Sequence, residues 1–318
     1  MAPTKVPIHP VYAASFEKTK NAPKVRNGDI TIEQMREFAN ARMKEIPVAQ
    51  IIEEDKTVVH NGTEIKLNLF RPVGTENDVL PVVVYYHGGG WVFGSKYTHG
   101  KAVRDICIKN NVAIVFVDYP LAPEVKFPVI HEVSYTALSW LVENGASINV
   151  DTSKLVIAGD SAGGNITASI TLMAKERGLG DAIKAQILIY PSTAPSREGY
   201  ESYILFGNGD YTLSLADIDF YGDAYYTPER NKIGFPLMAS KEDMTGLPPA
   251  LVFTAEADVL RDEGEQYARQ LTEAGVSVAC LRVIGATHGY VTVPVETPVY
   301  KQTMAMIKAH LDEAFERS

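Results

Sequence analysis

The sequence predicts an α/β fold with a mostly parallel central sheet of about eight strands, flanked by helices and with a helical cap. The first observation is an alternation, from residue 80 onward, of short apolar runs with helical stretches, which is typical of a parallel sheet buried on both faces. The second is a hairpin pattern just before this region, and the third is an aromatic-rich interval that interrupts the alternation. With 318 residues, 46% of them hydrophobic, the chain is long enough to bury a large core.

The first 70 residues predict one helix and an antiparallel strand pair. Residues 1–50 are punctuated by prolines, and a helix is expected over 31–44 because Thr31 followed by Gln34 fits a capping box. Residues 56–60 and 63–70 flank the pair Asn61-Gly62. This pattern predicts a hairpin closed by a type I′ turn at the start of the sheet.

Six short apolar runs predict the remaining strands, at 82–86, 112–117, 155–158, 185–190, 250–254 and 278–283. Helices are expected at 97–110, 128–144, 162–177, 262–274 and 295–315. Ligands of such sheets bind beyond the carboxyl ends of the strands. Motifs at those ends are therefore the candidate functional residues.

The interval between the sixth and seventh strands breaks the alternation. Residues 200–235 hold nine aromatic side chains in 36 positions, a quarter of the interval against 9% of the whole chain. Such an insertion after a strand's carboxyl end predicts a cap over the site. Most of these rings would also pack the insertion onto the body of the protein, whatever its function.

Composition narrows the classes of partner. The formal net charge is −9, the pI is near 5.3, and no lysine- and arginine-rich run occurs, so we expect no nucleic acid or anionic membrane surface as a partner. The first residues lack the apolar core of a signal peptide and nothing approaches an apolar span of ~18 residues, which favours a cytoplasmic protein without membrane insertion. Both Cys107 and Cys280 lie in apolar segments and are expected to be buried free thiols.

The segment Gly159-Asp160-Ser161-Ala162-Gly163 lies between an apolar strand and a small-residue helix. Read as strand, sharp turn and helix, it predicts a nucleophile elbow that lifts the Ser161 hydroxyl above the sheet. The flanking glycines would let the strand and helix backbones pass closely. The free N–H groups at the start of the helix would point at the reacting atom.

A serine hydroxyl needs a base, and the base needs an orienting acid. In this arrangement both follow the serine along the chain, and only two histidines do so. His310 lies in the final amphipathic helix, where a solvated or edge position is expected. His288 lies in a small-residue loop after an apolar strand and is the candidate base.

Several carboxylates after the strand 250–254 compete for the role of the acid. Asp258 is favoured because it lies a few residues past the strand end, and Glu256 is the alternative. Asp262 and Glu263 fall where a helix begins, so they are expected to cap it or to favour its dipole.

The segment His-Gly-Gly-Gly-Trp at 87–91 follows the strand 82–86 and predicts an oxyanion loop. Its donors are expected to be the backbone N–H groups of Gly88 and Gly89, together with Ala162 of the elbow. His87 is expected to brace the loop. A phosphate cradle is disfavoured because no Gly-Lys-Ser/Thr ending follows. No metal site stands out, since His131-Glu132 is not followed by a second histidine at helical spacing, and no cofactor is expected.

Taken together, the motifs at 87–91 and 159–163 with Asp258 and His288 resemble the hormone-sensitive lipase family of α/β-hydrolases, over residues 55–310. Further matches are the segments 118–124 and 258–264. Two departures are visible: Pro120 stands where the family usually has arginine, and Val259 where it usually has proline. Neither removes a catalytic atom.

This resemblance implies a serine carboxylesterase that acts on short- to medium-chain esters through an acyl-enzyme, with a cap built from two segments. We therefore expect an N-terminal cap segment at 1–50, the first part of the catalytic domain at 51–190, a cap insertion at 191–245 and the second part of the catalytic domain at 246–318. It also implies a bracing role for Asp160. The candidate pocket residues are Trp91, Phe93, Tyr190, Phe206 and Tyr211.

Alternative functions remain open at this point. The same constellation serves amidases, lactonases and formamidases, and relatives that lost the histidine act as small-molecule receptors. Retention of His288 argues against a receptor. The expected partner is a small-molecule ester, and the expected assembly is a monomer or a homodimer paired through an exposed last strand at 278–283.

Overall fold

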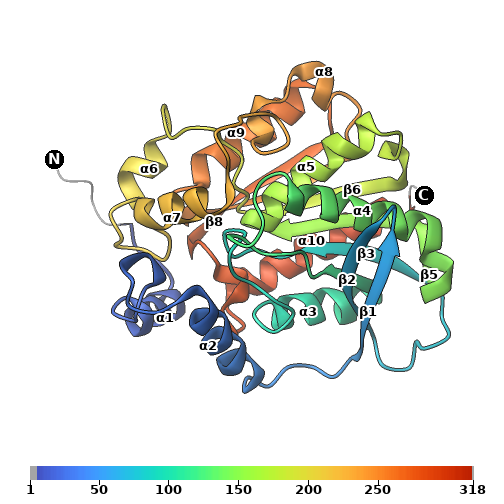
Figure 1. The fold of residues 1–318 in the computed structure, drawn as a ribbon, viewed down its shortest axis with the longest axis horizontal. Helices are drawn as coiled ribbons and strands as arrows, with labels where there is room; N and C mark the ends of the chain where they lie inside the picture. Colours follow the sequence, from blue (N-terminus) through green and yellow to red (C-terminus); the bar gives the residue numbers. More distant parts are fainter. Residues whose placement is uncertain (1–5, 317–318) are drawn as a thin grey trace.

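The computed structural model describes residues 6–316, which form one eight-stranded sheet with the strand order β1-β2-β4-β3-β5-β6-β7-β8 (Figure 1). β1 and β2 pair antiparallel, as do β2 and β4, and all other neighbours are parallel. The predicted mostly parallel sheet is thus confirmed. The strands are β1 (Ile52–His60), β2 (Thr63–Arg71), β3 (Leu80–Tyr86), β4 (Ala113–Val117), β5 (Val150–Asp160), β6 (Ile183–Ile189), β7 (Ala250–Ala257) and β8 (Val278–Thr287).

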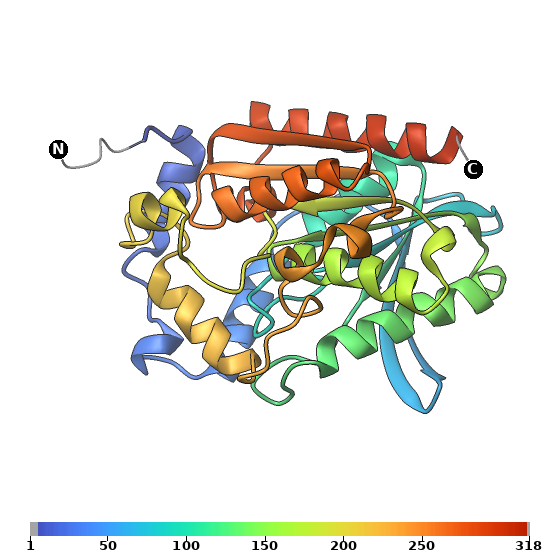
Figure 2. The ribbon, with the colours of Figure 1, turned by 90° about the horizontal axis from the view of Figure 1, so that it is seen from above.

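Helices cover both faces of the sheet (Figure 2). One layer holds α3 (Gly100–Asn110) and α10 (Pro298–Glu316), and the other holds α4 (Val129–Asn144), α5 (Ala162–Glu176) and α9 (Arg261–Glu273). Successive side chains of a strand point to opposite faces. Accordingly Val82, Val84 and Tyr86 pack toward α4 and α5, whereas Val83 and Tyr85 pack toward α3 and α10.

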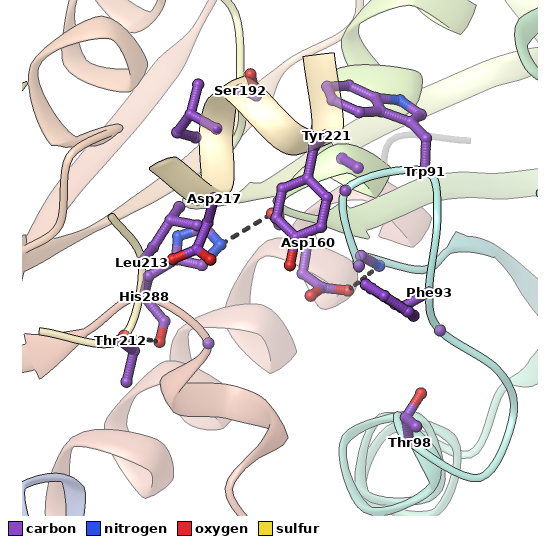
Figure 3. Close-up of a pocket in the computed structure, with 18 of the residues that line it drawn as sticks. Trp91, Phe93, Thr98, Asp160, Ser192, Thr212, Leu213, Asp217, Tyr221 and His288 are labelled. Carbon is purple, nitrogen blue, oxygen red and sulfur yellow. Dashed lines mark hydrogen bonds between the residues drawn. The ribbon is translucent and has the colours of Figure 1, made fainter. Parts of the chain in front are cut away.

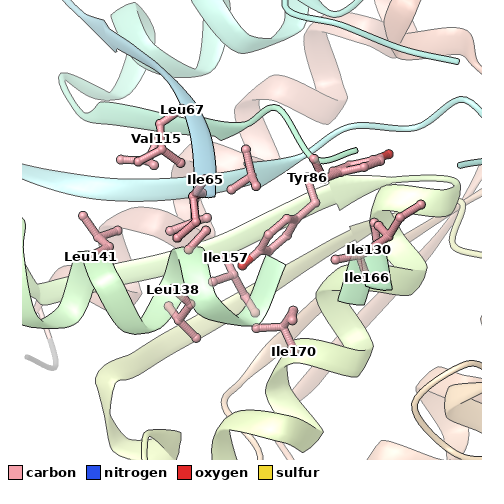
Figure 4. Close-up of a cluster of buried hydrophobic side chains, with 14 of the residues drawn as sticks. Ile65, Leu67, Tyr86, Val115, Ile130, Leu138, Leu141, Ile157, Ile166 and Ile170 are labelled. Atoms are coloured by element: carbon pink, nitrogen blue, oxygen red, sulfur yellow. The ribbon is translucent and has the colours of Figure 1, made fainter. Parts of the chain in front are cut away.

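The core between the sheet and helices α4 and α5 is made of interlocking branched and aromatic side chains (Figure 4). Tyr86 at the end of β3 is fully buried there, together with Ile157 of β5 and Ile166 of α5. Because the strands that carry the motifs are buried on both faces, their carboxyl ends are held in fixed positions. The loops that follow them start from a rigid frame.

Two helices precede the sheet, and one of them is not predicted by the sequence. α2 (Ile32–Lys44) begins at the expected capping box between Thr31 and Gln34. α1 (Pro10–Thr19) was missed because it has a weak apolar stripe: Tyr12 is its one buried residue. Proline at its first position and the His9 ring, which accepts from the Val11 N–H, define its start.

α2 buries none of its residues and is attached by polar contacts instead. The Arg36 guanidinium donates to the carbonyl oxygens of Val92 and Ala122, at 2.9 and 2.8 Å, and pairs with both oxygens of Glu124. The Ser95 hydroxyl donates to the Asn40 side chain at 2.6 Å. The position of α2 therefore depends largely on specific hydrogen bonds.

The aromatic-rich interval forms α6 (Glu201–Phe206) and α7 (Leu215–Tyr225), followed by the short α8 (Lys241–Met244). In both ribbon views α6 and α7 lie on the same side of the molecule as α1 and α2 (Figures 1 and 2). The two segments are joined by an ion pair between Arg26 and Asp217 and by a hydrogen bond from the Val6 N–H to the Tyr211 hydroxyl. The division into two cap segments and two catalytic parts stays a prediction.

β8 lies at one edge of the sheet, and its first residues are half-buried or exposed. Cys280 on this strand is exposed, so the expectation of a buried thiol is wrong there, while Cys107 in α3 is buried as predicted; both thiols are free. The apolar run around Cys280 did not show that one side of an edge strand faces solvent. Within residues 6–316, no helix combines the length and the apolar character that crossing a bilayer requires.

Candidate active site

Ser161 sits on a sharp turn between β5 and α5. Its φ of 56° and ψ of −118° place a non-glycine residue in a backbone region that is rarely occupied. A Cβ at Gly159 would lie 2.3 Å from the Gly163 carbonyl oxygen, and a Cβ at Gly163 would lie 1.9 Å from the Tyr86 carbonyl oxygen. The two glycines thus permit close contact between β5, α5 and the end of β3, which is the geometry of a nucleophile elbow.

The structure brings Ser161, His288 and Asp258 together from three separate segments. The Nε2 of His288 lies 2.9 Å from the Ser161 Oγ, and its Nδ1 lies 2.8 Å from the Asp258 Oδ2. The other oxygen of Asp258 accepts the Leu260 N–H at 3.0 Å, which fixes the orientation of the buried carboxylate. A serine, an imidazole and a carboxylate in this sequence of hydrogen bonds are arranged for proton transfer from the hydroxyl.

Glu256, the alternative acid, faces a different partner. Its Oε2 accepts the Gly285 N–H at 2.7 Å, so it braces the backbone that leads to His288. His310 lies on α10, whose apolar side packs against the opposite face of the sheet. Within residues 6–316, the Ser161 hydroxyl and the His288 ring form the hydrogen bonds described above, in which neither Glu256 nor His310 takes part.

The loop at 87–91 passes directly beside Ser161 in the cavity wall. The Gly88 N–H donates to the Asp160 Oδ1 at 3.0 Å and lies 3.3 Å from the His99 Nε2. Because this one N–H is directed at a carboxylate, it is not available to an oxyanion, contrary to the expectation for Gly88. Within residues 6–316, the N–H groups of Gly89, Gly90 and Ala162 make no intramolecular hydrogen bond.

Asp160 anchors this loop from beneath. Its carboxylate accepts from the Tyr85 hydroxyl at 2.9 Å and lies 3.2 Å from the His99 Nε2. Burial alone would raise the pKa of Asp160, but the neighbouring His99 and the hydrogen bonds from Tyr85 and the Gly88 N–H hold that pKa below its usual value. An ionised Asp160 therefore fixes the loop, as the resemblance implied.

His87 also braces the loop. Its ring stacks on Tyr119 at 4.1 Å, and its Nδ1 lies 2.8 Å from the Gly88 carbonyl oxygen. Burial lowers the pKa of the His87 imidazole to about 3, so the ring is neutral near pH 7. The Tyr119 hydroxyl donates to the His87 carbonyl oxygen at 2.5 Å, which holds the backbone as well.

A cavity of about 1440 Å³ opens above Ser161 (Figure 3). Four of the five expected aromatic residues line it, namely Trp91, Phe93, Tyr190 and Tyr211. Phe206 does not, because it is buried in a cluster with Tyr203 and Tyr211 on the body side of α6. The Tyr190 ring lies 4.7 Å from the His288 ring and so forms part of the wall beside the base.

The segment after Asp258 is fastened to the cap. Glu263, expected as a first-turn acid of α9, is fully buried and accepts the N–H groups of Thr193 and Ala194 and the hydroxyl of Tyr203. Burial is the first cause that raises the pKa of Glu263, to about 7. On the other side of the site, the Thr212 hydroxyl donates to the His288 carbonyl oxygen at 2.8 Å. Residues of the interval 193–212 thus touch both the segment after Asp258 and the loop that carries His288.

Sequence reasoning gave no role in the site to Gly90 or Tyr221, and it expected Glu263 only as a first-turn acid of α9. Gly90 belongs to the glycine trio that the sequence analysis identified. It became a candidate oxyanion donor only because the Gly88 N–H is hydrogen-bonded to Asp160, which the sequence does not show. Tyr221 was one of nine aromatic residues in the cap interval, with nothing in the sequence to distinguish it. Among residues 6–316 no group of acidic, histidine and cysteine side chains is placed to hold a metal ion.

Comparison with known proteins identifies the family to which this chain belongs. A family model described as the alpha/beta hydrolase fold matches residues 83–292. The chain belongs to the α/β-hydrolase family. This family includes the esterases similar to hormone-sensitive lipase, so the resemblance drawn from the motifs is confirmed.

Two curated relatives of this α/β-hydrolase cover most of the chain. A putative alpha/beta hydrolase of Acanthamoeba polyphaga mimivirus, R526, is 34% identical over 94% of this chain and 86% of its own length. The carboxylesterase NlhH of Mycobacterium tuberculosis is 37% identical over 82% of this chain and 84% of its own length.

Two solved structures are similar over nearly the whole chain. One of two fungal esterases from Rhizomucor miehei has a TM-score of 0.95 and 51% identity, covering 99% of both chains. A thermostable esterase from Pseudomonas putida has a TM-score of 0.91 and 34% identity, covering 98% of this chain and 99% of its own.

Proposed function

We propose that this α/β-hydrolase is a serine carboxylesterase that cleaves short- to medium-chain esters through an acyl-enzyme intermediate. One observation carries the proposal: the Ser161 hydroxyl is hydrogen-bonded to His288, which is hydrogen-bonded to the buried Asp258, and both Ser161 and His288 line an open cavity. The esterase relatives support the same class of reaction for this chain.

In the first half-reaction, the Nε2 of His288 takes the proton as the Ser161 Oγ attacks the ester carbonyl carbon. Asp258 holds the ring in the tautomer with its proton on Nδ1 and stabilises the imidazolium that forms. The tetrahedral oxyanion accepts hydrogen bonds from the N–H groups of Gly89, Gly90 and Ala162. This donor set replaces the one expected from the sequence, because the Gly88 N–H is already bound to Asp160.

Collapse of the intermediate returns the proton from His288 to the alcohol oxygen, and the alcohol leaves. A water molecule then loses its proton to His288 and attacks the acyl carbon. As the second tetrahedral intermediate collapses, the bond from the acyl carbon to the Ser161 Oγ breaks, His288 returns the proton to this oxygen, and the carboxylic acid is released. Each oxyanion donor contributes roughly 10²–10³ in turnover, since preorganised donors cost no reorganisation during the reaction.

The resemblance to esterases of short- and medium-chain substrates is the basis for the proposed acyl range, and the cavity lining bears on its selectivity. The cavity walls near Ser161 carry Trp91, Phe93 and Tyr190, and an apolar wall distinguishes substrates by only ~1–3 kcal/mol per methylene. Broad selectivity among short and medium acyl chains is therefore expected. The hydrogen bond between His288 and Ser161 disfavours the non-catalytic receptor.

The experiment is hydrolysis of p-nitrophenyl butyrate by the wild type and by Ser161→Ala. We expect wild-type turnover and a loss of at least ~10⁴-fold in the variant. Full activity of Ser161→Ala would refute the nucleophile. Matched amides and lactones of butyric acid, assayed beside the ester, separate esterase from amidase and lactonase: faster cleavage of either would refute the ester preference.

A further inference from the structure

One face of α7 forms the roof of the cavity. Asp217 and Ile218 lie four and three positions before Tyr221, so each shares a side of the helix with it, and all three line the cavity. In Figure 3, Tyr221 extends from the cap into the cavity and lies between His288 and Phe93. This residue thus approaches the reacting groups from the side opposite to the sheet.

The Tyr221 ring is held against the oxyanion loop. A Cβ at Gly90 would lie only 2.4–2.6 Å from three of its ring carbons, so the ring packs directly on the Gly90 backbone. On another side it meets Phe93 edge to face, with the ring centroids 6.1 Å apart. A ring held by these two contacts keeps its hydroxyl in one place.

The hydroxyl of this ring has no partner among residues 6–316, although it is not one of the polar atoms sealed inside the protein. Four of the five other tyrosines that line the cavity donate to a protein oxygen, namely Tyr190, Tyr203, Tyr211 and Tyr226. Burial raises the pKa of Tyr221, so the group is a neutral donor near pH 7. A fixed, accessible and unpaired donor beside the oxyanion loop points to a ligand atom as its acceptor.

We propose that the Tyr221 hydroxyl donates a hydrogen bond to the substrate and selects esters that carry a second oxygen acceptor near the ester group, such as alkoxy, hydroxy or oxo derivatives. The inference rests on the proposed ester hydrolysis. The carbonyl oxygen already has three backbone donors at Gly89, Gly90 and Ala162, so a fourth donor suits a different oxygen. A hydrocarbon chain would displace water from this hydroxyl without replacing its hydrogen bond.

The test removes the Tyr221 oxygen and, separately, one oxygen of the substrate. Wild type and Tyr221→Phe are assayed for kcat/KM on two pairs of equal length: p-nitrophenyl methoxyacetate with p-nitrophenyl butyrate, and 2-methoxyethyl butyrate with butyl butyrate. For each pair, the kcat/KM on the oxygenated ester is divided by the kcat/KM on the hydrocarbon ester. The difference in chemical reactivity between the two esters is the same for both enzymes, so it cancels when this ratio is compared between the wild type and the variant. We expect that ratio to fall about 3- to 10-fold in Tyr221→Phe on one of the pairs.

Tyr135→Phe is the matched control. Tyr135 lies on α4, its hydroxyl also makes no hydrogen bond within the described residues, and it does not line the cavity. Both ratios should be unchanged in this control, and the unfolding midpoint of Tyr221→Phe should match the wild type.

The role of Tyr221 is overturned if both ratios are unchanged in a Tyr221→Phe protein that still cleaves p-nitrophenyl butyrate. A wild type that cleaves none of the four esters instead overturns the proposed function.

Discussion

The close contact of α5 with the end of β3 makes Gly163→Ala the most informative single substitution. The new Cβ would lie 1.9 Å from the Tyr86 carbonyl oxygen, 2.5 Å from the Tyr86 carbonyl carbon and 2.7 Å from the His87 carbonyl carbon. All three are backbone atoms, so no side-chain rotation relieves the overlap. Contacts under 3.0 Å essentially do not occur for Cβ atoms, and the helix and the strand end must separate by about 1 Å.

Two opposing contributions set the change in the free energy of unfolding that Gly163→Ala causes. Alanine is favoured over glycine by ~1 kcal/mol inside a helix, whereas overpacking costs typically about 1–3 kcal/mol and occasionally more. We expect net destabilisation, because the new Cβ would overlap with backbone atoms of Tyr86 and His87, which cannot move aside as a side chain can. The separation would also move the donors at Gly89 and Gly90 away from Ser161, and a displacement of about 1 Å costs on the order of 10²-fold in rate.

Thermal unfolding followed by circular dichroism, together with kcat/KM on p-nitrophenyl butyrate, measures both effects. Gly100→Ala is the matched control, because Gly100 also lies in the first turn of a helix and its Cβ would meet nothing within 4 Å. The control should keep or slightly raise the unfolding midpoint. A Gly163→Ala protein with the wild-type midpoint and activity would refute the packing argument.

Three further predictions follow from individual contacts. Asp258→Asn should lower kcat by about 10⁴-fold because the imidazole loses the carboxylate that orients it. Glu256→Gln affects only the hydrogen bond to the Gly285 N–H and should lower kcat far less. The reverse order of the two effects would contradict the assignment of the acid. Arg36→Lys should speed proteolytic cleavage within residues 20–50, since lysine does not reproduce the forked contacts that hold α2; an unchanged cleavage rate would count against that attachment. In the folded protein the pKa of Glu263 is about 7, above the usual 4.5, so the folded state keeps a proton that the unfolded state loses. The free energy of unfolding should therefore fall as the pH rises from 4.5 to 7. Denaturant titrations should show a fall of up to about 3 kcal/mol in the wild type, and this fall should be absent from Glu263→Gln.

Several parts of the site follow from the sequence because they depend on local rules. The elbow at 159–163 needs glycines at fixed spacing, and the hairpin needs Asn61-Gly62, whose φ values of 50° and 76° suit a type I′ turn. The choice of His288 followed from chain order, since few histidines come after Ser161. The elbow and the hairpin turn are each encoded within a few neighbouring residues.

Other parts were inaccessible because they depend on residues far apart in the chain. Phe206 was expected in the cavity, but α6 turns its ring toward the Tyr203 cluster. The helix α1 has a single buried residue, so its amphipathic signal was too weak to detect. The exposure of Cys280 depends on β8 being an edge strand.

The sequence by itself determined the fold class and the strand–turn–helix around Ser161, because both are expressed in short-range spacing and in the period of apolar residues. Only the tertiary structure shows that the Gly88 N–H is bound to Asp160 and that the Tyr221 ring packs against Gly90. Asp160 and Gly88 are 72 positions apart, and Tyr221 meets Gly90 from a helix in the cap. Hydrogen-bond competition and ring packing are decided by distance in space, and no local pattern records that distance.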